Sequence, residues 1–221
     1  MSVKSKRPTT AAARAELLDV IRHQRACRQF SADAVPEADI EAMVEAATHA
    51  PSAENRQPWA FIVVRDPSTR AAVDTLTQDL WQAGGRAHSE QSLTPEMFAE
   101  VDAFFGGGYG GAPVLVVVAG DGRDGSPAGL LASSVFPATQ NLLLAAAALG
   151  YGSSMTTLAT RSPVLAELLA LPEGMRAFAI VPIGRPAKAL GPPRRRPVRE
   201  VAHRDRFGTR WDPPSESSAG R

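Results

Sequence analysis

Ala50-Pro-Ser-Ala-Glu-Asn-Arg-Gln-Pro-Trp59 connects an amphipathic helix pattern to a strand pattern, and it is too polar to belong to either. Pro51 and Pro58 each push the preceding residue out of the helical region of conformational space. The backbone of this loop is therefore predicted to follow a restricted course. Such a loop fixes where the helix before it ends and where the strand after it begins.

Three side chains of this loop are neutral groups that can both donate and accept hydrogen bonds: Ser52, Asn55 and Gln57. This set suits the edge of a planar, uncharged heterocycle better than it suits a phosphate or a metal ion. An ordinary helix-to-strand connection rich in turn-forming residues has the same composition. Taken alone, the loop leaves both interpretations open.

The composition places the chain among ordinary globular proteins. Its 221 residues fit one large domain, and 44% of them are hydrophobic, which is ample for a core. The formal net charge of +1 gives no reason to expect a nucleic acid or an anionic membrane as a partner. The single cysteine, Cys27, excludes an intramolecular disulfide and a zinc site built from several cysteines, and it is compatible with a cytoplasmic location.

The two ends of the chain are predicted to be disordered tails, over residues 1–12 and 209–221, around one domain at 13–208. The N-terminus is polar and basic with no apolar run after it, so no signal peptide is expected. The longest apolar run, near residues 142–149, is too short to cross a membrane.

Hydrophobic periodicity predicts helices and strands in alternation. The strand at 59–64 is apolar on both faces and is therefore expected at the centre of a sheet. The predicted helices are 13–24, 36–47, 66–82, 95–105, 128–149 and 162–171, and the predicted strands are 59–64, 114–119 and 177–183, with a short strand or turn at 152–157.

The helix pattern at 128–149 is apolar almost all round, which favours a position at the centre of the molecule or in a dimer interface. Pro137 within it costs one backbone hydrogen bond and indicates a kink or a later start.

Residues 83–111 are predicted to be irregular apart from one helix, and their glycines suggest a mobile lid or a plain surface loop. Gly106, Gly108 and Gly111 have the spacing of a dinucleotide-binding fingerprint. That fingerprint must follow a strand and open a helix, whereas these glycines precede a strand, so we reject this interpretation.

Two basic segments could bind an anion. Arg25 and Arg28 are close enough in sequence to converge on one phosphate just past a helix end, although a solvated basic turn is the alternative. The segment 192–197 holds three arginines between prolines and is predicted to be an extended arm or a basic linker. The four histidines show no metal-ligand spacing, so no metal site is predicted.

Taken together, these segments resemble the nitroreductase family of flavin enzymes. Arg25-Ala-Cys-Arg28-Gln-Phe30 is similar to the family's Arg-Ser-x-Arg-x-Phe signature, and the loop at 50–59 is similar to its Ala-Pro-Ser-x-x-Asn-x-Gln-Pro-Trp motif. Residues 140–153 resemble its central helix and flavin-facing turn, and Arg195-Arg-Pro197 resembles its phosphate-binding arm. The departure is Ala26, which replaces the usual serine and removes one hydroxyl contact.

The resemblance implies a mixed α+β fold with a mainly antiparallel central sheet flanked by helices. It also implies a homodimer that exchanges extended C-terminal arms and holds two flavin mononucleotides (FMN) at its interface. The cofactor site that it implies consists of Arg25, Ala26, Arg28, Pro51, Ser52, Ala53, Asn55, Gln57, Met155, Thr156, Thr157, Arg195 and Arg196.

The resemblance also assigns roles. Arg25, Arg28 and Arg195 would hold the phosphate, with Arg194 and Arg196 as possible helpers. The loop side chains would face the flavin from the other subunit, and backbone groups at 155–157 would meet the ring near its reactive nitrogen. Cys27 is predicted to be structural, because the chemistry needs no thiol.

The activity that the resemblance implies is reduction of a small electron acceptor, such as a nitroaromatic or a quinone, with NAD(P)H as hydride donor in a ping-pong cycle. No acid–base side chain is required, because the flavin carries the chemistry. The alternatives are a flavin-binding or storage protein without turnover, and a relative that performs reductive dehalogenation or oxygen-dependent flavin breakdown.

Overall fold

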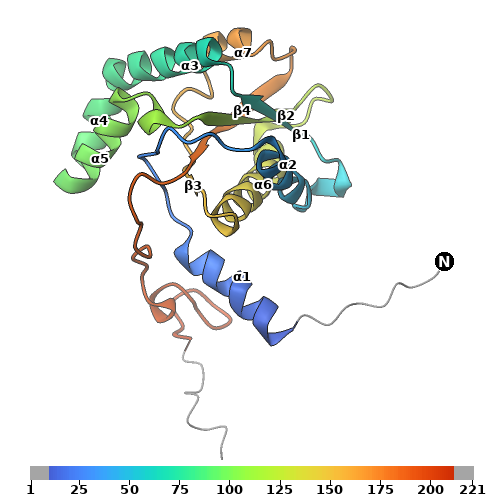
Figure 1. The fold of residues 1–221 in the computed structure, drawn as a ribbon. Helices are drawn as coiled ribbons and strands as arrows, with labels where there is room; N and C mark the ends of the chain where they lie inside the picture. Colours follow the sequence, from blue (N-terminus) through green and yellow to red (C-terminus); the bar gives the residue numbers. More distant parts are fainter. Residues whose placement is uncertain (1–9, 212–221) are drawn as a thin grey trace, which may run out of the picture.

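The computed structural model describes residues 10–211, and most of both predicted tails lies outside this range. A four-stranded antiparallel sheet runs through the centre in the order β1-β2-β4-β3 (Figure 1). Its strands are β1 (Trp59–Val64), β2 (Val114–Asp121), β3 (Gly152–Ser153) and β4 (Met175–Gly184). The predicted fold class, helices around a mainly antiparallel sheet, is confirmed.

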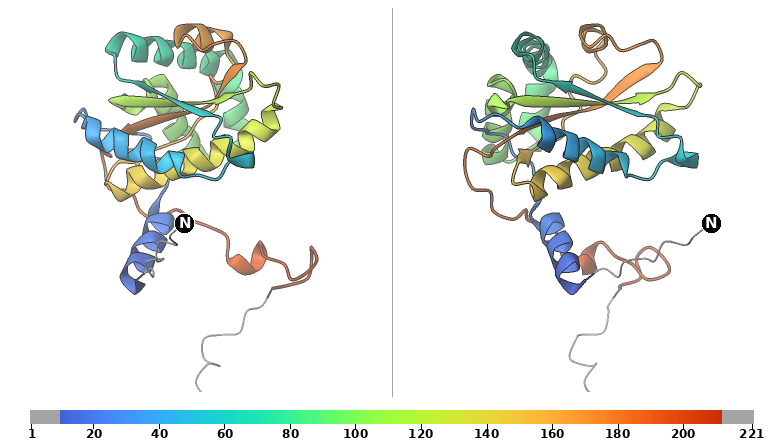
Figure 2. Two further views of the ribbon diagram at one scale, coloured as in Figure 1. Left: turned by 90° about the vertical axis from the view of Figure 1, so that its right-hand side faces the viewer. Right: turned by 45° about the vertical axis from the view of Figure 1, so that its right-hand side comes forward.

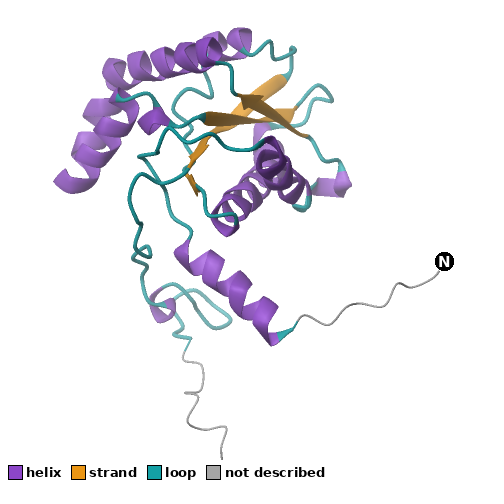
Figure 3. Cartoon of the chain, viewed as in Figure 1, coloured by secondary structure: helices purple, strands orange, loops and turns teal. Residues whose placement is uncertain are grey.

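Helices cover both faces of this sheet (Figures 1 and 3). The longer helices are α1 (Ala11–His23), α2 (Glu37–Thr48), α3 (Pro67–Leu80), α4 (Arg86–Ser92), α5 (Pro95–Gly106), α6 (Ala128–Ala148) and α7 (Pro163–Leu168). The short helical segments are η1 (Ala53–Asn55), η2 (Trp81–Gly85), η3 (Tyr109–Gly111) and η4 (Val198–Glu200).

Strand β2 holds the two halves of the core together because its side chains alternate between the faces. Val116 and Val118 join the cluster beneath α2 and α6, whereas Leu115 and Val117 join the cluster beneath α3, α5 and α7. All of these side chains are fully buried. A strand buried on both faces explains why the sequence at 114–119 is apolar without alternation.

The predicted central position of β1 is wrong, because β1 pairs with β2 alone and forms an edge of the sheet. Phe61 and Val63 pack against one core cluster and Ile62 packs against the other. Both faces of β1 are therefore covered even though one of its edges is unpaired. The apolar composition of a strand indicates that both of its faces are covered, but it does not indicate whether the strand pairs with a neighbour on each edge.

Helix α6 continues through Pro137 and begins at Ala128, so the later start suggested by that proline is wrong. Leu142 and Val135 are completely buried against the sheet and α2, while Phe136 on the other side is 37% exposed. By length and composition alone α6 could cross a membrane, although no apolar run of that length was predicted. Its packing against β2, β4 and α2 is that of a core helix.

The glycine-rich segment before β2 is packed into the body. Tyr109 is 1% exposed, and its hydroxyl lies 2.6 Å from the hydroxyl of Thr77 on α3. The carbonyl of Gly110 accepts a hydrogen bond from Phe30 N–H at 3.0 Å. The prediction of an irregular segment is wrong for residues 83–92, which belong to η2 and α4, and a lid role for 83–111 stays a prediction.

Helix α1 and the segment after Gly184 extend from the same end of the body (Figure 2). α1 has no buried residue, and its apolar side chains Leu17 and Ile21 are 57% and 48% exposed. The segment 185–211 is mostly extended and also carries exposed apolar side chains, among them Val198 at 61% and Phe207 at 93%. These two segments therefore lack a core of their own within one chain.

Gly110 should not tolerate a side chain. Its φ is +64°, and a Cβ there would lie 2.1 Å from the carbonyl oxygen of Arg28. We expect Gly110→Ala to lower the free energy of unfolding by about 2 kcal/mol or more, and thus to lower Tm by roughly 4–8 °C. Gly106→Ala is the matched control, because a Cβ at Gly106 meets nothing within 4 Å. Equal Tm values for the two variants in thermal denaturation would contradict this account.

Candidate functional site

The loop at 50–58 is held by its own side chains. Ser52 Oγ accepts a hydrogen bond from Gln57 N–H at 3.0 Å, and Gln57 Nε2 donates to Asn55 Oδ1 at 3.1 Å. The backbone N–H of Ala53 donates to Ser134 Oγ on α6 at 3.2 Å. The predicted restriction of this backbone is thus achieved by hydrogen bonds as well as by its two prolines.

This loop also stores backbone strain. Glu54, Asn55 and Gln57 have φ values of 54°, 55° and 51°, a region that side-chain-bearing residues rarely adopt. Strained residues close together are typical of sites where geometry serves a function. Asn55 and Gln57 are exposed, so their remaining amide groups face outward, where a ligand could meet them.

A cavity of about 540 Å³ opens beside the loop and is lined by Gln57, by the end of β2 and by the start of α6. Its charged side chains are paired with one another. Arg56 donates to Asp124 at 2.8 Å, and Arg123 donates to Asp121 at 2.8 Å. The hydrogen bond from Arg123 lowers the pKa of Asp121 to about 2, so the second pair stays ionised at neutral pH. The cavity therefore offers little net charge.

Residues 25–30, here called the arginine turn, and residues 152–157, here called the flavin-facing turn, lie side by side near the Gly184 end of β4. The N–H of Cys27 donates to the carbonyl of Ser153 at 2.9 Å, and Ala26 forms a parallel bridge with Ser153. Further along, Thr156 exchanges two backbone hydrogen bonds with Ile180 of β4, at 3.0 and 2.9 Å. Two segments that are far apart in the sequence are thus fixed in one place by the sheet.

Polar groups in this region suit an anionic, hydrogen-bonding cofactor. Ser154 is 4% exposed, and its Oγ has no hydrogen-bond partner among the described residues. A buried polar atom without a partner needs an explanation, and a bound group is one. Arg25 adds a positive charge whose hydrogen bond goes to the carbonyl of Gly191 at 3.1 Å. This donor set fits the flavin phosphate and ribityl chain implied by the resemblance.

The structure directs Arg28 differently from Arg25. Arg28 donates to Glu100 of α5 at 3.0 Å and lies 3.7 Å from the sulfur of Met97, with its side chain 21% exposed. Its charge is therefore already compensated within the chain. Within the chain, Arg25 thus contacts Gly191 and Arg28 contacts Glu100, and a shared role for both in phosphate binding stays a prediction. The pairing of Arg28 with Glu100 had no sequence signal, because the two residues are 72 positions apart.

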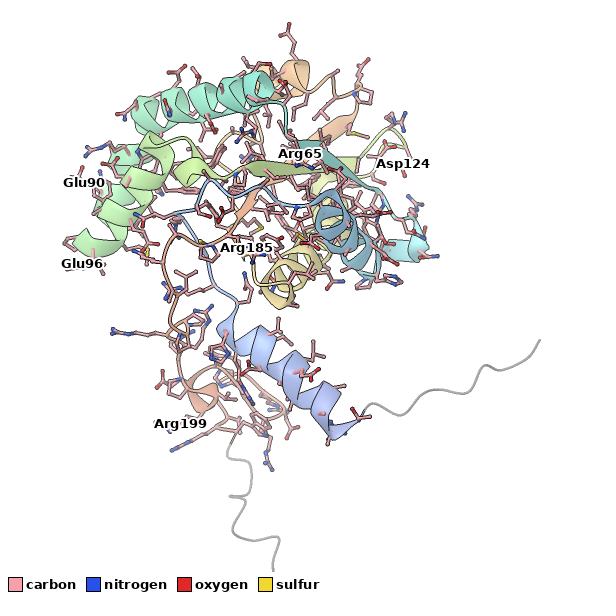
Figure 4. The ribbon with its side chains drawn as sticks, viewed as in Figure 1. Arg65, Glu90, Glu96, Asp124, Arg185 and Arg199 are labelled. Carbon is pink, nitrogen blue, oxygen red and sulfur yellow. The ribbon has the colours of Figure 1, made fainter. Side chains whose placement is uncertain are left out.

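The C-terminal arm begins near the arginine turn but then leaves it. The hydrogen bond from Arg25 to Gly191 ties the start of the arm to the turn, and Arg195 donates to the carbonyl of Arg194 at 3.0 Å. Figure 4 shows Arg199 further along the arm, at the same end of the molecule as α1 and away from the sheet. Arg196, which follows Arg195 in the sequence, is exposed.

The remaining residues of the predicted cofactor site lie on the surface or between the loop at 50–58 and the arginine turn. Pro51 is exposed next to Ser52, and Met155 is 46% exposed where the flavin-facing turn leaves β4. Thr157 follows it and lines a second cavity, described below. Ser134 and Ser154, which hold or border the two turns, were missed from the sequence, because isolated serines carry no distinguishing pattern.

The loop at 50–58 and the arginine turn are separated by the length of β4. Asp121 N–H donates to the carbonyl of Pro58 at 2.7 Å, and Asp121 pairs with Met175 at one end of β4. Gly152 pairs with Gly184 at the other end. Ten residues of strand span roughly 30 Å. Within one chain, the loop at 50–58 and the arginine turn therefore lie on opposite sides of the molecule.

Comparison with known proteins agrees with the family resemblance found in the sequence. The sequence model of the Nitroreductase family matches residues 21–185. A protein of Archaeoglobus fulgidus provisionally named NADH dehydrogenase/NAD(P)H nitroreductase is 33% identical over 174 residues, which cover 77% of this chain and 86% of that protein. Iodotyrosine deiodinase of Haliscomenobacter hydrossis is 32% identical over 192 residues, covering 79% and 81%.

Among solved structures, a protein of Desulfovibrio desulfuricans, provisionally described as a nitroreductase in complex with FMN, superposes with a TM-score of 0.67 at 26% identity. The match covers 92% of this chain and 99% of that one.

Cys27 should behave as a buried structural thiol. It is 1% exposed, its Sγ donates to the carbonyl of Gln29 at 3.3 Å, and burial is the main cause that raises the pKa of its thiol. The thiolate is the reactive form. We therefore expect iodoacetamide at pH 8 to alkylate the native protein far more slowly than the guanidinium-unfolded protein. Equal rates, followed by mass spectrometry, would show an accessible and reactive thiol.

Proposed function

This chain belongs to the nitroreductase family, and from that premise we propose that it is an FMN-dependent oxidoreductase. It takes a hydride from NAD(P)H and delivers electrons to a small acceptor such as a nitroaromatic or a quinone. The observation that carries the proposal is the joining of the arginine turn to the segment 153–157, which contains the unpartnered Ser154 hydroxyl. The single buried cysteine is compatible with a cytoplasmic location.

The arginine side chains would hold the cofactor phosphate. Arg25 stands at the turn, and Arg195 and Arg196 lie on the arm that Arg25 tethers through Gly191. Guanidinium groups suit this task because their planar fork donates two hydrogen bonds to one phosphate. Ala26 supplies no hydroxyl, so the phosphate would depend more on these arginines than in relatives with serine at this position.

Backbone groups of the flavin-facing turn would orient the ring. The N–H of Thr156 is already used by the carbonyl of Ile180, which leaves the N–H groups of Met155 and Thr157 available. When bound, FMN supplies the hydride-accepting and hydride-donating chemistry. An N–H aimed at the ring would stabilise its reduced, electron-rich form. This chain's own residues would thus bind and orient, and none of them would have to transfer a proton.

We further propose that the working unit is a homodimer with a composite site. The loop at 50–58 and the arginine turn lie at opposite ends of β4, a separation longer than one FMN molecule. A second copy could bring its loop against the first copy's arginine turn. Exposed apolar side chains on α1 and along the arm support this assembly, because one chain leaves them uncovered. In this arrangement the arm would lie across the partner.

Reductive dehalogenation is the second candidate, and the observation that favours it is the similarity to iodotyrosine deiodinase over 79% of this chain. Dehalogenation by this chain would use the same cofactor site as the reduction of a nitroaromatic or a quinone, and only the electron acceptor would differ. Flavin storage without turnover remains the alternative from a different class.

Turnover decides between an enzyme and a storage protein. We expect FMN-loaded protein to oxidise NADH or NADPH, and a quinone to increase this rate severalfold by reoxidising the flavin. The measurement is the loss of nicotinamide absorbance with and without quinone. Boiled protein plus free FMN is the control. No nicotinamide oxidation above that control, with flavin still bound, would favour storage.

The phosphate-binding arginines and the loop at 50–58 should respond differently to substitution. A hydrogen bond to a charged group contributes about 1.5–3 kcal/mol, so Arg195→Ala should weaken FMN binding roughly tenfold to a hundredfold. Arg199→Ala, an arginine on the same arm, is the matched control. Asn55→Ala should instead keep FMN bound but turn over slowly, because it would touch the ring.

Fluorescence titration of apoprotein with FMN measures the first effect, and steady-state rates measure the second. If Arg195→Ala binds FMN as tightly as Arg199→Ala does, the arm has no part in the phosphate site.

A further inference from the structure

A second cavity, of about 960 Å³, lies along β4 on the side away from β2, where the flavin-facing turn has ended. One wall is the first half of α6, and the opposite wall is the segment from Thr157 to Ala166. The first residues of β4 form its floor, and Met175 separates it from the cavity beside the loop. Its polar and charged lining residues are Thr157, Thr160, Arg161, Ser162 and Arg176.

The charge of this cavity is uncompensated. Arg161 and Arg176 are both exposed, and neither guanidinium has a hydrogen bond or an ion pair within residues 10–211. No aspartate or glutamate is among the described residues that line it. The arginines of the first cavity behave differently, since Arg56 and Arg123 are each bonded to a carboxylate. Two unpaired guanidinium groups on one cavity favour an anionic ligand.

The apolar part of the lining favours an aromatic ligand. Phe136 of α6 and Phe178 of β4 meet edge to face, with ring centroids 6.1 Å apart and planes at 90°. Ala132 and Ala166 add small side chains beside them, so the walls leave room for a flat ring. Aromatic rings pack favourably against one another in offset or edge-to-face geometry. Cavities of this kind, apolar with a few convergent polar groups, are the usual form of small-molecule sites.

The position of the cavity connects it to the proposed redox site. Thr157, which lines the cavity, belongs to the turn predicted to meet the flavin ring, and its carbonyl accepts a hydrogen bond from Thr160 Oγ1 at 2.8 Å. We propose that this cavity selects the electron acceptor, and that the preferred acceptor is an aromatic compound bearing a carboxylate. This inference rests on the proposed function, because it names the acceptor class of that activity.

The test compares 4-nitrobenzoate with 4-nitrobenzamide, a neutral compound of nearly the same shape. FMN-loaded protein is assayed for KM and kcat with NAD(P)H as donor, and for binding by equilibrium dialysis without donor. We expect the wild-type protein to prefer the carboxylate on the order of tenfold in both KM and Kd, because charge-assisted hydrogen bonds are stronger than neutral ones but are weakened by exposure.

Arg161→Gln and Arg176→Gln should each bring the carboxylate-to-amide ratio toward unity. Arg199→Gln, which removes the same charge from the arm, should leave the ratio as in the wild type. The preference should also weaken as salt is raised from about 0.05 to 0.5 M, because exposed charges are screened. This salt test needs no variant, so it remains decisive if a variant folds poorly.

The outcomes separate the two proposals. Equal KM and Kd values for the two compounds, with turnover present, would overturn the carboxylate preference while leaving the redox function in place. Preferential carboxylate binding that Arg176→Gln abolishes, without turnover, would support the site and overturn the redox function. A preference that survives in both arginine variants would place the selecting charge elsewhere and overturn this assignment.

Discussion

Strand β4 sets the geometry on which the proposed site depends. It pairs with β2 along one edge over its whole length, and with β3 only at its Gly184 end. The loop at 50–58 is tied to the Met175 end and the arginine turn to the other end, so the β2–β4 ladder, which has one bulge between Val118 and Ala119, holds them apart. Such a ladder does not bend enough to bring its ends together. In the proposed homodimer, a cofactor that contacts both the loop and the arginine turn would therefore bridge two chains.

The arginine turn is rigid for reasons that lie outside the site. Gly110 packs against the carbonyl of Arg28, and Gly152 leaves no room for a Cβ beside the sulfur of Cys27. The ion pair between Arg28 and Glu100 then links this turn to α5. These contacts place the turn without using the side chain of Arg25. In a site that must bind a charged group, a backbone that is already fixed reduces the entropy that binding would cost.

Sequence patterns correctly predicted those structural features that depend on residues close together in the chain. The proline-bounded loop, the long apolar helix near Leu142 and the β2 strand follow from turn chemistry and burial, and all three were predicted. The edge position of β1 and the pairing of Arg28 with Glu100 depend on which distant segments meet, and residue type alone does not encode that. The roles of Arg195 and of the loop side chains came from resemblance, and they stay predictions because they require a second chain.

The most direct test of the composite site is complementation in a mixed dimer. Chains carrying Arg25→Ala and chains carrying Asn55→Ala are co-expressed with different tags, and the doubly tagged dimer is purified. If the site spans two chains, each mixed dimer regains one intact site, made by the unaltered arginine turn of one chain and the unaltered loop of the other. Its FMN-dependent turnover should then be about half that of the wild-type dimer. If each site lies within a single chain, every site in the mixed dimer is damaged, and activity no higher than that of the two parent variants would contradict the account.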